Sequence, residues 1–290
     1  MVVKNLLLFC ILLISVGRLS AQVTVDVVTE QDEFLPGEDI PAVAHIVNHS
    51  GETLKLGNDN EWLKFSVSGR DGYVVLKSGD VPVNQPFTLE SSERATVHVN
   101  LAPYFHMPRA GHYLITATVT IPGWTRQVNS SPKGFDVIQG ARLWQEQFGV
   151  PSRADTTNAM PEVRTYALQE ANYLRSRLML YAQVSDRAGK LNKVVPIGPM
   201  VSFGQPEPKV DKSSNLNVLY QNGPHTFNYT VVNPDGNIIL RQTYDFTSRP
   251  QMMANADGEL SIVGGTRRVT RNDIPPPTVT SIDTNVLSPP

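Results

Sequence analysis

Hydrophobic and polar residues alternate with a period of two along much of the chain, most clearly between residues 215 and 244. Three such runs, at residues 216–221, 227–231 and 238–241, are separated by turn sequences rich in Asn, Gly and Pro. Alternation with this period is typical of β-strands, and Pro and Gly favour the backbone angles of tight turns. The stretch therefore predicts a three-stranded meander, with Phe227, Tyr229 and Val231 facing a core and Asn228 facing away from it.

Strand-like runs also recur at short intervals between residues 22 and 138, separated by clusters of Gly, Pro, Asn and Asp. Ile40, Ala42, Ala44 and Ile46 share one face of one run, and the alternate positions 113–121 share one face of the most regular run. Short strands at this spacing are typical of an antiparallel β-sandwich. We therefore predict a sandwich for this part of the chain.

Three short motifs in the same region resemble a known class of domain. They are Phe34-Leu35-Pro36-Gly37-Glu38-Asp39-Ile40, Val47-Asn48-His49-Ser50-Gly51 and Gly111-His112-Tyr113-Leu114-Ile115-Thr116-Ala117. Together they resemble the immunoglobulin-like domains of bacterial surface proteins and the macroglobulin-type domains of protease-trapping proteins. The resemblance implies a scaffold that spaces, binds or presents, and no catalytic residue carries over from it.

The second half of the chain is expected to be a separate domain. Residues 139–162 lack the alternation and contain an aromatic patch, with Trp144 and Phe148, followed by a polar run bounded by Pro. We interpret them as a linker, and we expect the two aromatic rings to fill the seam between the domains. Residues 163–270 form a second all-β domain, in which residues 165–180 have a helix-like composition but are interpreted as strand. Residues 271–290 are predicted to be a disordered, Pro-rich tail.

A partial repeat suggests how this second domain is built. Residues 215–219 are echoed by residues 259–263, at a separation that suits the blades of a β-propeller, although too few units are present to close a ring. The predicted fold class is thus all-β, an N-terminal immunoglobulin-like β-sandwich followed by a second β-meander domain with blade-like repeats.

The first 21 residues have the features of a signal peptide. Lys4 precedes an apolar run at residues 6–16, and Leu19-Ser20-Ala21 provides a small-residue cleavage site. An uncleaved anchor is the alternative, but the apolar run is shorter than the roughly 20 residues needed to span a bilayer. We therefore expect a secreted protein, or one in the periplasm or at the cell surface, with no membrane span after cleavage.

Charge and cysteine content narrow the possible functions. The net charge is −2, and cleavage would remove two of the 25 basic residues, Lys4 and Arg18, and the only cysteine, Cys10. Without a basic excess, nucleic acid is not an expected partner. A chain that lacks cysteine forms no disulfide, thiolate metal site or cysteine nucleophile.

Candidate chemistry is sparse. Oxygen-rich stretches at residues 58–61, 233–237 and 255–259 lack the full ligand pattern of a calcium loop, so we interpret them as hairpin turns and predict no metal or cofactor. Trp124, Tyr220 and Tyr229 could stack on a sugar or a peptide if exposed, whereas the alternation assigns Tyr220 and Tyr229 to apolar faces.

These observations favour a secreted non-enzymatic binding or structural protein of bacterial type, with an unknown protein or carbohydrate partner. One alternative is an exported hydrolase, or an enzyme accessory, that acts on polysaccharide through carboxylates brought together by the fold. The resemblance offers another, a macroglobulin-like protease-inhibitor fragment, although the mature chain would have no cysteine for a thioester.

The signal peptide can be tested directly. We expect the protein recovered from outside the cytoplasm to begin at Gln22, because Ala21 ends the small-residue cleavage site. N-terminal sequencing measures this. Intact Met1 in a membrane fraction would contradict the prediction.

Overall fold

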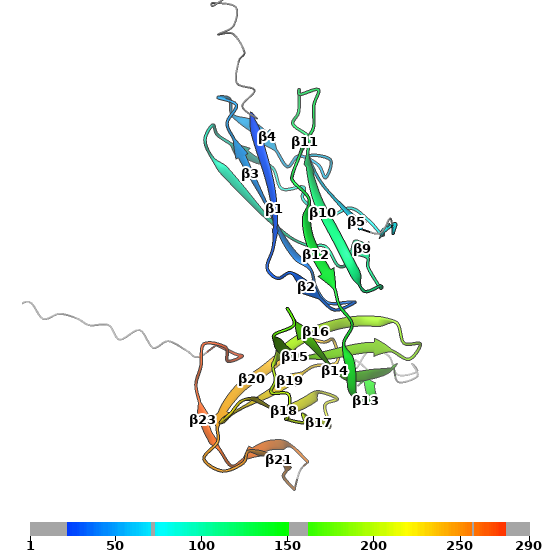
Figure 1. Cartoon of the computed structure of the whole chain (residues 1–290), viewed down its shortest axis with the longest axis vertical. Coiled ribbons are helices and arrows are strands. Elements are labelled where there is room, and N and C mark those ends of the chain that lie inside the picture. Colours follow the sequence, from blue (N-terminus) through cyan, green and yellow to red (C-terminus); the bar gives the residue numbers. More distant parts are fainter. Residues whose placement is uncertain (1–21, 71–72, 151–161, 257, 277–290) are drawn as a thin grey trace, which may run out of the picture.

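The computed structural model describes residues 22–70, 73–150, 162–256 and 258–276, and all regular elements in these ranges are β-strands. The all-β fold class is therefore confirmed. Figure 1 shows two groups of strands stacked along the long axis of the molecule, which we call the N-terminal half, residues 22–138, and the C-terminal half, residues 139–276. The predicted signal peptide and the end of the predicted tail lie outside the described residues. No helix within those ranges has the length and apolarity needed to cross a membrane.

The N-terminal half is built on two main sheets, with two short strand pairs beside them. One sheet has the order β1-β3-β8, and the other has the order β11-β10-β12-β2 with β5 also paired to β10. The strands are β1 (Val23–Thr29), β2 (Glu33–Phe34), β3 (Pro41–Asn48), β4 (Leu54–Leu56), β5 (Leu63–Gly69), β6 (Leu76–Lys77), β7 (Phe87–Leu89), β8 (Arg94–Asn100), β9 (Phe105–His106), β10 (Gly111–Val119), β11 (Val128–Asn129) and β12 (Lys133–Val137).

A single apolar core joins these sheets. Alternate residues of β10 from Tyr113 to Val119 are buried, as are Ile40, Ala42, Ala44 and Ile46 on and next to β3, so the predicted inward faces are confirmed. Aromatic side chains in the core pack edge-to-face or stacked; Tyr113, for example, stacks on Phe135 with ring centroids 5.6 Å apart. Burial of this kind is the dominant stabilising contribution in a protein interior.

The C-terminal half also has two main sheets. They are the meander β13-β14-β15-β16 and the sheet β17-β18-β19-β20-β23, and the hairpin β21-β22 packs beside the second one. The strands are β13 (Ala141–Val150), β14 (Glu162–Tyr173), β15 (Arg177–Asp186), β16 (Leu191–Pro199), β17 (Glu207–Val210), β18 (Leu216–Gly223), β19 (Thr226–Val232), β20 (Ile238–Asp245), β21 (Gln251–Ala254), β22 (Leu260–Val263) and β23 (Thr266–Arg268). The predicted meander is thus present as β18, β19 and β20.

The two sheets of the C-terminal half share a core of their own. Leu168, Leu180 and Ile197 from the first sheet pack in one buried cluster with Leu216 and Val218 from the second. Each strand contributes alternate side chains to the space between the layers. The arrangement is two stacked meanders.

The predicted linker at residues 139–162 is wrong for its first part. Residues Ala141–Val150 are the edge strand β13, whose side chains are mostly exposed, so no alternation is visible in the sequence. Trp144 and Phe148 do not plug the seam, because both pack against the core between the two sheets, and Phe148 stacks on Tyr166 with centroids 4.1 Å apart. Residues 151–161 lie outside the described residues.

Residues 165–173 and 177–180 are strand, as interpreted, in spite of their helix-forming composition, and residues 174–176 form the turn between β14 and β15. β14 is paired along its length with β13 on one side and β15 on the other. Such pairing overrides the small differences in intrinsic propensity between residue types.

Two other sequence predictions need correction. The partial repeat is not structural, because residues 216–219 belong to β18 inside a sheet whereas residues 260–263 form β22 of a two-stranded hairpin. The tail does not begin at residue 271: Arg241 N donates to Ile274 O at 3.0 Å, and buried Asp273 accepts from Arg267 Nη2 at 2.6 Å. These bonds fix residues 271–274 against β20 and β23. The sequence contains no sign of them, because they do not depend on an alternating pattern.

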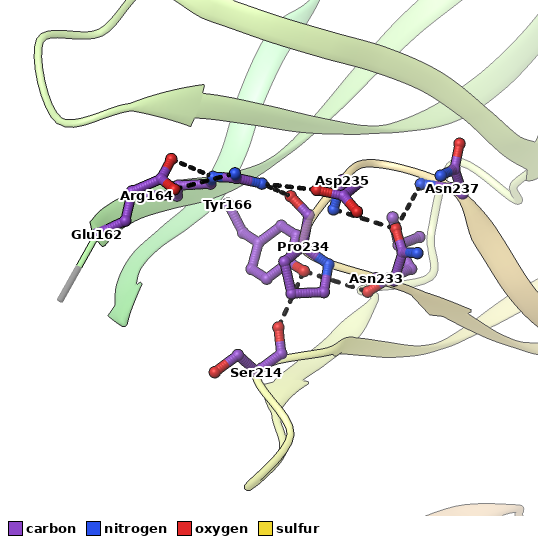
Figure 2. Close-up of polar contacts among 9 residues, drawn as sticks. Glu162, Arg164, Tyr166, Ser214, Asn233, Pro234, Asp235 and Asn237 are labelled. Atoms are coloured by element: carbon purple, nitrogen blue, oxygen red, sulfur yellow. Dashed lines mark hydrogen bonds and ion pairs between the residues drawn. The ribbon is translucent and has the colours of Figure 1, made fainter. Parts of the chain in front are cut away.

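A polar cluster ties the two sheets of the C-terminal half together at one end (Figure 2). Arg164 on β14 bonds to Glu162 on its own strand, with Nε 2.7 Å from Oε1, and reaches the turn between β19 and β20, where Nη1 donates to Pro234 O at 2.7 Å and to Asp235 Oδ1 at 3.0 Å. Beside it, the Tyr166 hydroxyl donates to the backbone carbonyls of Ser214, in the turn before β18, and of Val232 on β19. Burial raises the pKa of Tyr166, so this hydroxyl remains a donor.

β19 is covered on both faces, so Asn228 faces away from the core of Phe227, Tyr229 and Val231, as predicted, but is not exposed there. Phe227, Tyr229 and Val231 do face a core, under the hairpin. Asn228, however, is 7% exposed on the inner face, where its Nδ2 donates to the Tyr220 hydroxyl at 3.3 Å and its Oδ1 accepts from Thr243 Oγ1 at 3.1 Å. The sequence could not reveal this, because a polar residue at an alternate position looks the same whether water or a buried partner satisfies it.

The buried amide leads to a stability prediction. We expect Asn228→Ala to lower the free energy of unfolding by about 1 to 3 kcal/mol, because it leaves Thr243 Oγ1 without its acceptor in a buried site. Denaturant unfolding monitored by circular dichroism measures the change. Asn129→Ala, at an exposed position, is the matched control and should change it by less than about 0.5 kcal/mol. Equal effects for the two variants would contradict the burial of Asn228.

Candidate functional site

The outer face of the second C-terminal sheet carries a cleft of about 350 Å³, which lies within the range of small-molecule sites. It is bounded by the sheet, by the turn between β17 and β18, and by the hairpin β21-β22. The lining residues are Asp211, Lys212, Ser213, Asn217, Tyr229, Val231, Ile239, Leu240, Gly258, Glu259 and Leu260.

The strands place the floor of the cleft. Tyr229 and Val231 on β19 lie on the face opposite Asn228, because successive side chains of a strand point to opposite faces. Leu240 on β20 is opposite Val231 in the strand register and extends the same apolar surface. The floor is therefore a continuous apolar strip over two adjacent strands.

The hairpin forms the wall. Met252 and Leu260 pack on the same apolar cluster as Tyr229, and Lys209 Nζ donates to Met252 O at 2.9 Å, which fixes the hairpin to β17. The Lys212 side chain packs closely on Gly258 in the hairpin turn, because a Cβ added to Gly258 would lie 2.5 Å from Lys212 Cε. Two turns distant in sequence thus meet at one end of the cleft.

A carboxylate organises the polar end. Asp211 Oδ1 accepts from the backbone N–H groups of Ser213 and Asn215, both at 2.9 Å, and Oδ2 accepts from the side-chain amides of Asn215 at 3.2 Å and Asn217 at 3.1 Å. Four bonds occupy the acceptor positions of a carboxylate. Asp211 therefore builds the turn and offers little to a ligand.

Tyr229 is tied into the same network. Its hydroxyl donates to Asn217 Oδ1 at 2.6 Å. Burial raises the pKa of Tyr229 to about 12, and the nearby Asp211 adds to the shift, so the hydroxyl stays protonated at neutral pH. The tyrosine is a fixed part of the floor, with 5% of its surface exposed.

The arrangement suits binding better than bond cleavage. Two carboxylates, Asp211 and Glu259, line the cleft as a hydrolase would require, but the oxygens of Asp211 are held by four donors. Exposed polar groups of Lys212, Ser213 and Glu259 stand at the rim above the apolar floor. In the part of the chain that the structure describes, no group of three His, Cys, Asp or Glu side chains is placed to hold a metal ion.

The structure does not bring the three predicted binding residues together. Trp124 packs against the core of the N-terminal half, Tyr220 belongs to the core between the two C-terminal sheets, and Tyr229 belongs to the cluster under the hairpin. Tyr220 is 1% exposed and its hydroxyl donates to Ile197 O at 2.5 Å, so its ring has no free face for a ligand. Among the three, Tyr229 alone lines the cleft.

The remaining cleft residues were not selected from the sequence. Residues 255–259 were noted as oxygen-rich, and the interpretation as a hairpin turn is confirmed by the bond from Asn255 N to Glu259 O at 2.9 Å; residues 233–237 close in the same way. The alternation of Asp211, Ser213, Asn215 and Asn217 was the signal that could have indicated a polar turn next to Tyr229. The position of the hairpin over β20 had no local signal.

Comparison with known proteins gives no family for the chain. The sequence matches no protein-family model and no curated protein. Among solved structures it is similar to Spo0M, a sporulation control protein from Bacillus subtilis, with 11% sequence identity and a TM-score of 0.32 over 61% of this chain and 89% of that one.

The hydroxyl of Tyr229 can be tested alone. We expect Tyr229→Phe to lower the free energy of unfolding by about 1 to 2 kcal/mol, because it leaves Asn217 Oδ1 buried without a donor. Denaturant unfolding measures the change. Tyr104→Phe is the matched control, since the Tyr104 hydroxyl has no hydrogen-bond partner within the described ranges, and it should change stability by less than about 0.5 kcal/mol. A Tyr229→Phe variant as stable as the control would show that the bond to Asn217 contributes nothing.

Proposed function

We propose that the chain is an exported, non-enzymatic binding protein whose C-terminal cleft takes a saccharide. In this proposal the N-terminal half is a scaffold of the immunoglobulin-like or macroglobulin type that presents the C-terminal half to its ligand. The observation that carries it is the combination, in one cleft of about 350 Å³, of an apolar floor and an exposed polar rim.

Saccharides need both kinds of surface. The C–H faces of a sugar ring pack on apolar side chains, here Ile239, Leu240 and Leu260, while the hydroxyls bond to carboxylate, ammonium and hydroxyl groups such as those of Glu259, Lys212 and Ser213. The floor residues are held by the sheet and by buried hydrogen bonds. A preformed site of this kind loses little conformational entropy when a ligand binds.

Hydrolysis of a polysaccharide is the second candidate, and it is favoured by the presence of Asp211 and Glu259 in one cleft. A glycosidase needs one carboxyl as acid and another as nucleophile or base. The four donors on Asp211 argue against such a role for it. Binding therefore fits the cleft better than catalysis does.

Calorimetric titration with a panel of neutral and acidic hexasaccharides tests the proposal. We expect the wild-type protein to bind one class and Ile239→Asp to weaken that binding by about tenfold or more, because it places a charge at an exposed apolar residue that lines the cleft. Val269→Asp is the matched control: Val269 is exposed but does not line the cleft, and the variant should bind as the wild type does.

Two results would contradict the proposal. One is a panel that does not bind at all, and the other is equal binding by the two variants. Release of reducing ends from a bound saccharide, lost in Glu259→Gln, would instead favour the hydrolase.

A further inference from the structure

The two halves of the molecule meet at a seam that both of them build. Leu35, from the loop after β2, is buried in one cluster with Ala171, Tyr181 and Val194 of the C-terminal half. The same loop bonds to the edge of β16, where Val194 N donates to Gly37 O at 3.1 Å. The seam thus combines apolar contact with a backbone hydrogen bond between the halves.

The loop leaves no spare room at this point. Gly37 has a φ of +83°, and a Cβ added there would lie 3.1 Å from Leu191 Cδ1. Glu38, the next residue, forms a parallel bridge with Val194. The loop and β16 are therefore in direct contact along Gly37 and Glu38.

Glu38 holds the loop from within. Its side chain is 3% exposed; Oε2 accepts from the backbone N–H of Leu35 at 2.8 Å, and Oε1 accepts from Gln31 Nε2 at 2.9 Å. Glu38 N in turn donates to Leu35 O at 3.0 Å. The carboxyl thereby fixes the position of Leu35, which is the residue that the loop inserts into the seam.

The groups around this carboxyl supply no direct counter-charge. On its own loop the neighbour is Asp39, which lies 3.9 Å from Lys193 Nζ of β16. From β15 the nearby titratable group is Tyr181. Tyr173 of β14 lies near Tyr181, and its hydroxyl accepts from Asp32 N at 3.4 Å. Glu33 on β2 is also close to Tyr181, and its Oε2 accepts from Leu174 N.

None of the ion pairs formed among the described residues includes Glu38. Burial raises the pKa of Glu38 from 4.5 to about 7; the hydrogen bonds from Leu35 and Gln31 oppose the shift, and Asp39 adds to it. Burial is the largest of these causes, so the position of the pKa depends on the seam being closed.

We propose that Glu38 is a proton-controlled latch between the two halves. With a proton bound, the carboxyl lies in the seam without a buried charge, and the loop stays packed on β16. When the proton is lost, the buried carboxylate favours a state in which water reaches the loop, and the contact between Gly37 and Val194 is weakened.

The direction of the pH dependence follows from the pKa of Glu38 in the open and the closed seam. In an open seam the carboxyl is in water and has its ordinary pKa of 4.5, whereas in the closed seam the pKa is about 7. The closed form therefore retains a proton that the open form has released. Its contribution to closure is fully present below pH 4.5 and is lost as the pH rises through about 7.

Amide hydrogen exchange of the full chain reads the latch directly. The Val194 N–H bonds across the seam, so its protection, corrected for the intrinsic effect of pH on exchange, reports closure. We expect this protection to fall by about tenfold or more between pH 5 and pH 8 in the wild type. The Ile115 amide, in the core of the N-terminal half, reports global unfolding and should not follow the same curve.

Two variants separate the latch from general charge effects. Glu38→Gln keeps the shape of the side chain but cannot ionise, so the protection of Val194 should no longer depend on pH. Asp39→Asn removes the adjacent carboxylate and should retain the wild-type pH dependence. The proposal is overturned if Glu38→Gln shows the same pH dependence as the wild type, or if the wild type shows none.

A direct titration covers the case in which Glu38→Gln does not fold. Carbon-13 NMR of the Glu38 side-chain carboxyl in the wild type should give a midpoint near pH 7. A midpoint near the ordinary value of 4.5 would overturn the proposal.

Discussion

Burial on both faces of the sheet around β18 and β19 is the constraint on which the C-terminal half depends. On one face Leu216, Val218 and Tyr220 pack into the core with the first sheet, and on the other Leu219 and Tyr229 pack under the hairpin. If a strand that is covered on both sides shifts its register by one residue, the side chains that face one core are moved to the other core. The register in turn fixes Tyr229, Val231 and Leu240 as the floor of the cleft.

The polar groups inside this half are placed by the same constraint. Asn228, Thr243 and the Tyr220 hydroxyl bond to one another between the sheets, and the Tyr166 hydroxyl bonds to the second sheet from the first. Bonds of this kind add modest net stability when they are made and are costly when one partner is removed. They therefore select one alignment of the two layers, while the apolar contacts provide most of the attraction between them.

The sequence was sufficient where a strand has one buried and one solvated face. The alternation in β10 predicted the burial of Tyr113, Ile115 and Ala117 correctly, because water covers the other side. It failed for β13, an edge strand exposed at most positions, and for Asn228, whose partners come from other strands. The sequence did not predict the cleft and named only Tyr229 among its lining residues as a candidate for binding. The wall of the cleft depends on the hairpin β21-β22, whose position leaves no local pattern in the sequence.

Glu38 illustrates a further limit of reading the chain alone. Glu38 lies in the first of the three motifs that resemble immunoglobulin-like domains, next to Pro36 and Gly37, and a glutamate is normally solvated. It is nevertheless 3% exposed, and the loop that holds it forms a bridge with Val194 of β16 in the other half. The seam and the cleft use different residues and different sheet surfaces. A protein with this structure can therefore respond to pH through the relation between its halves while the cleft, fixed within the C-terminal half, keeps its shape.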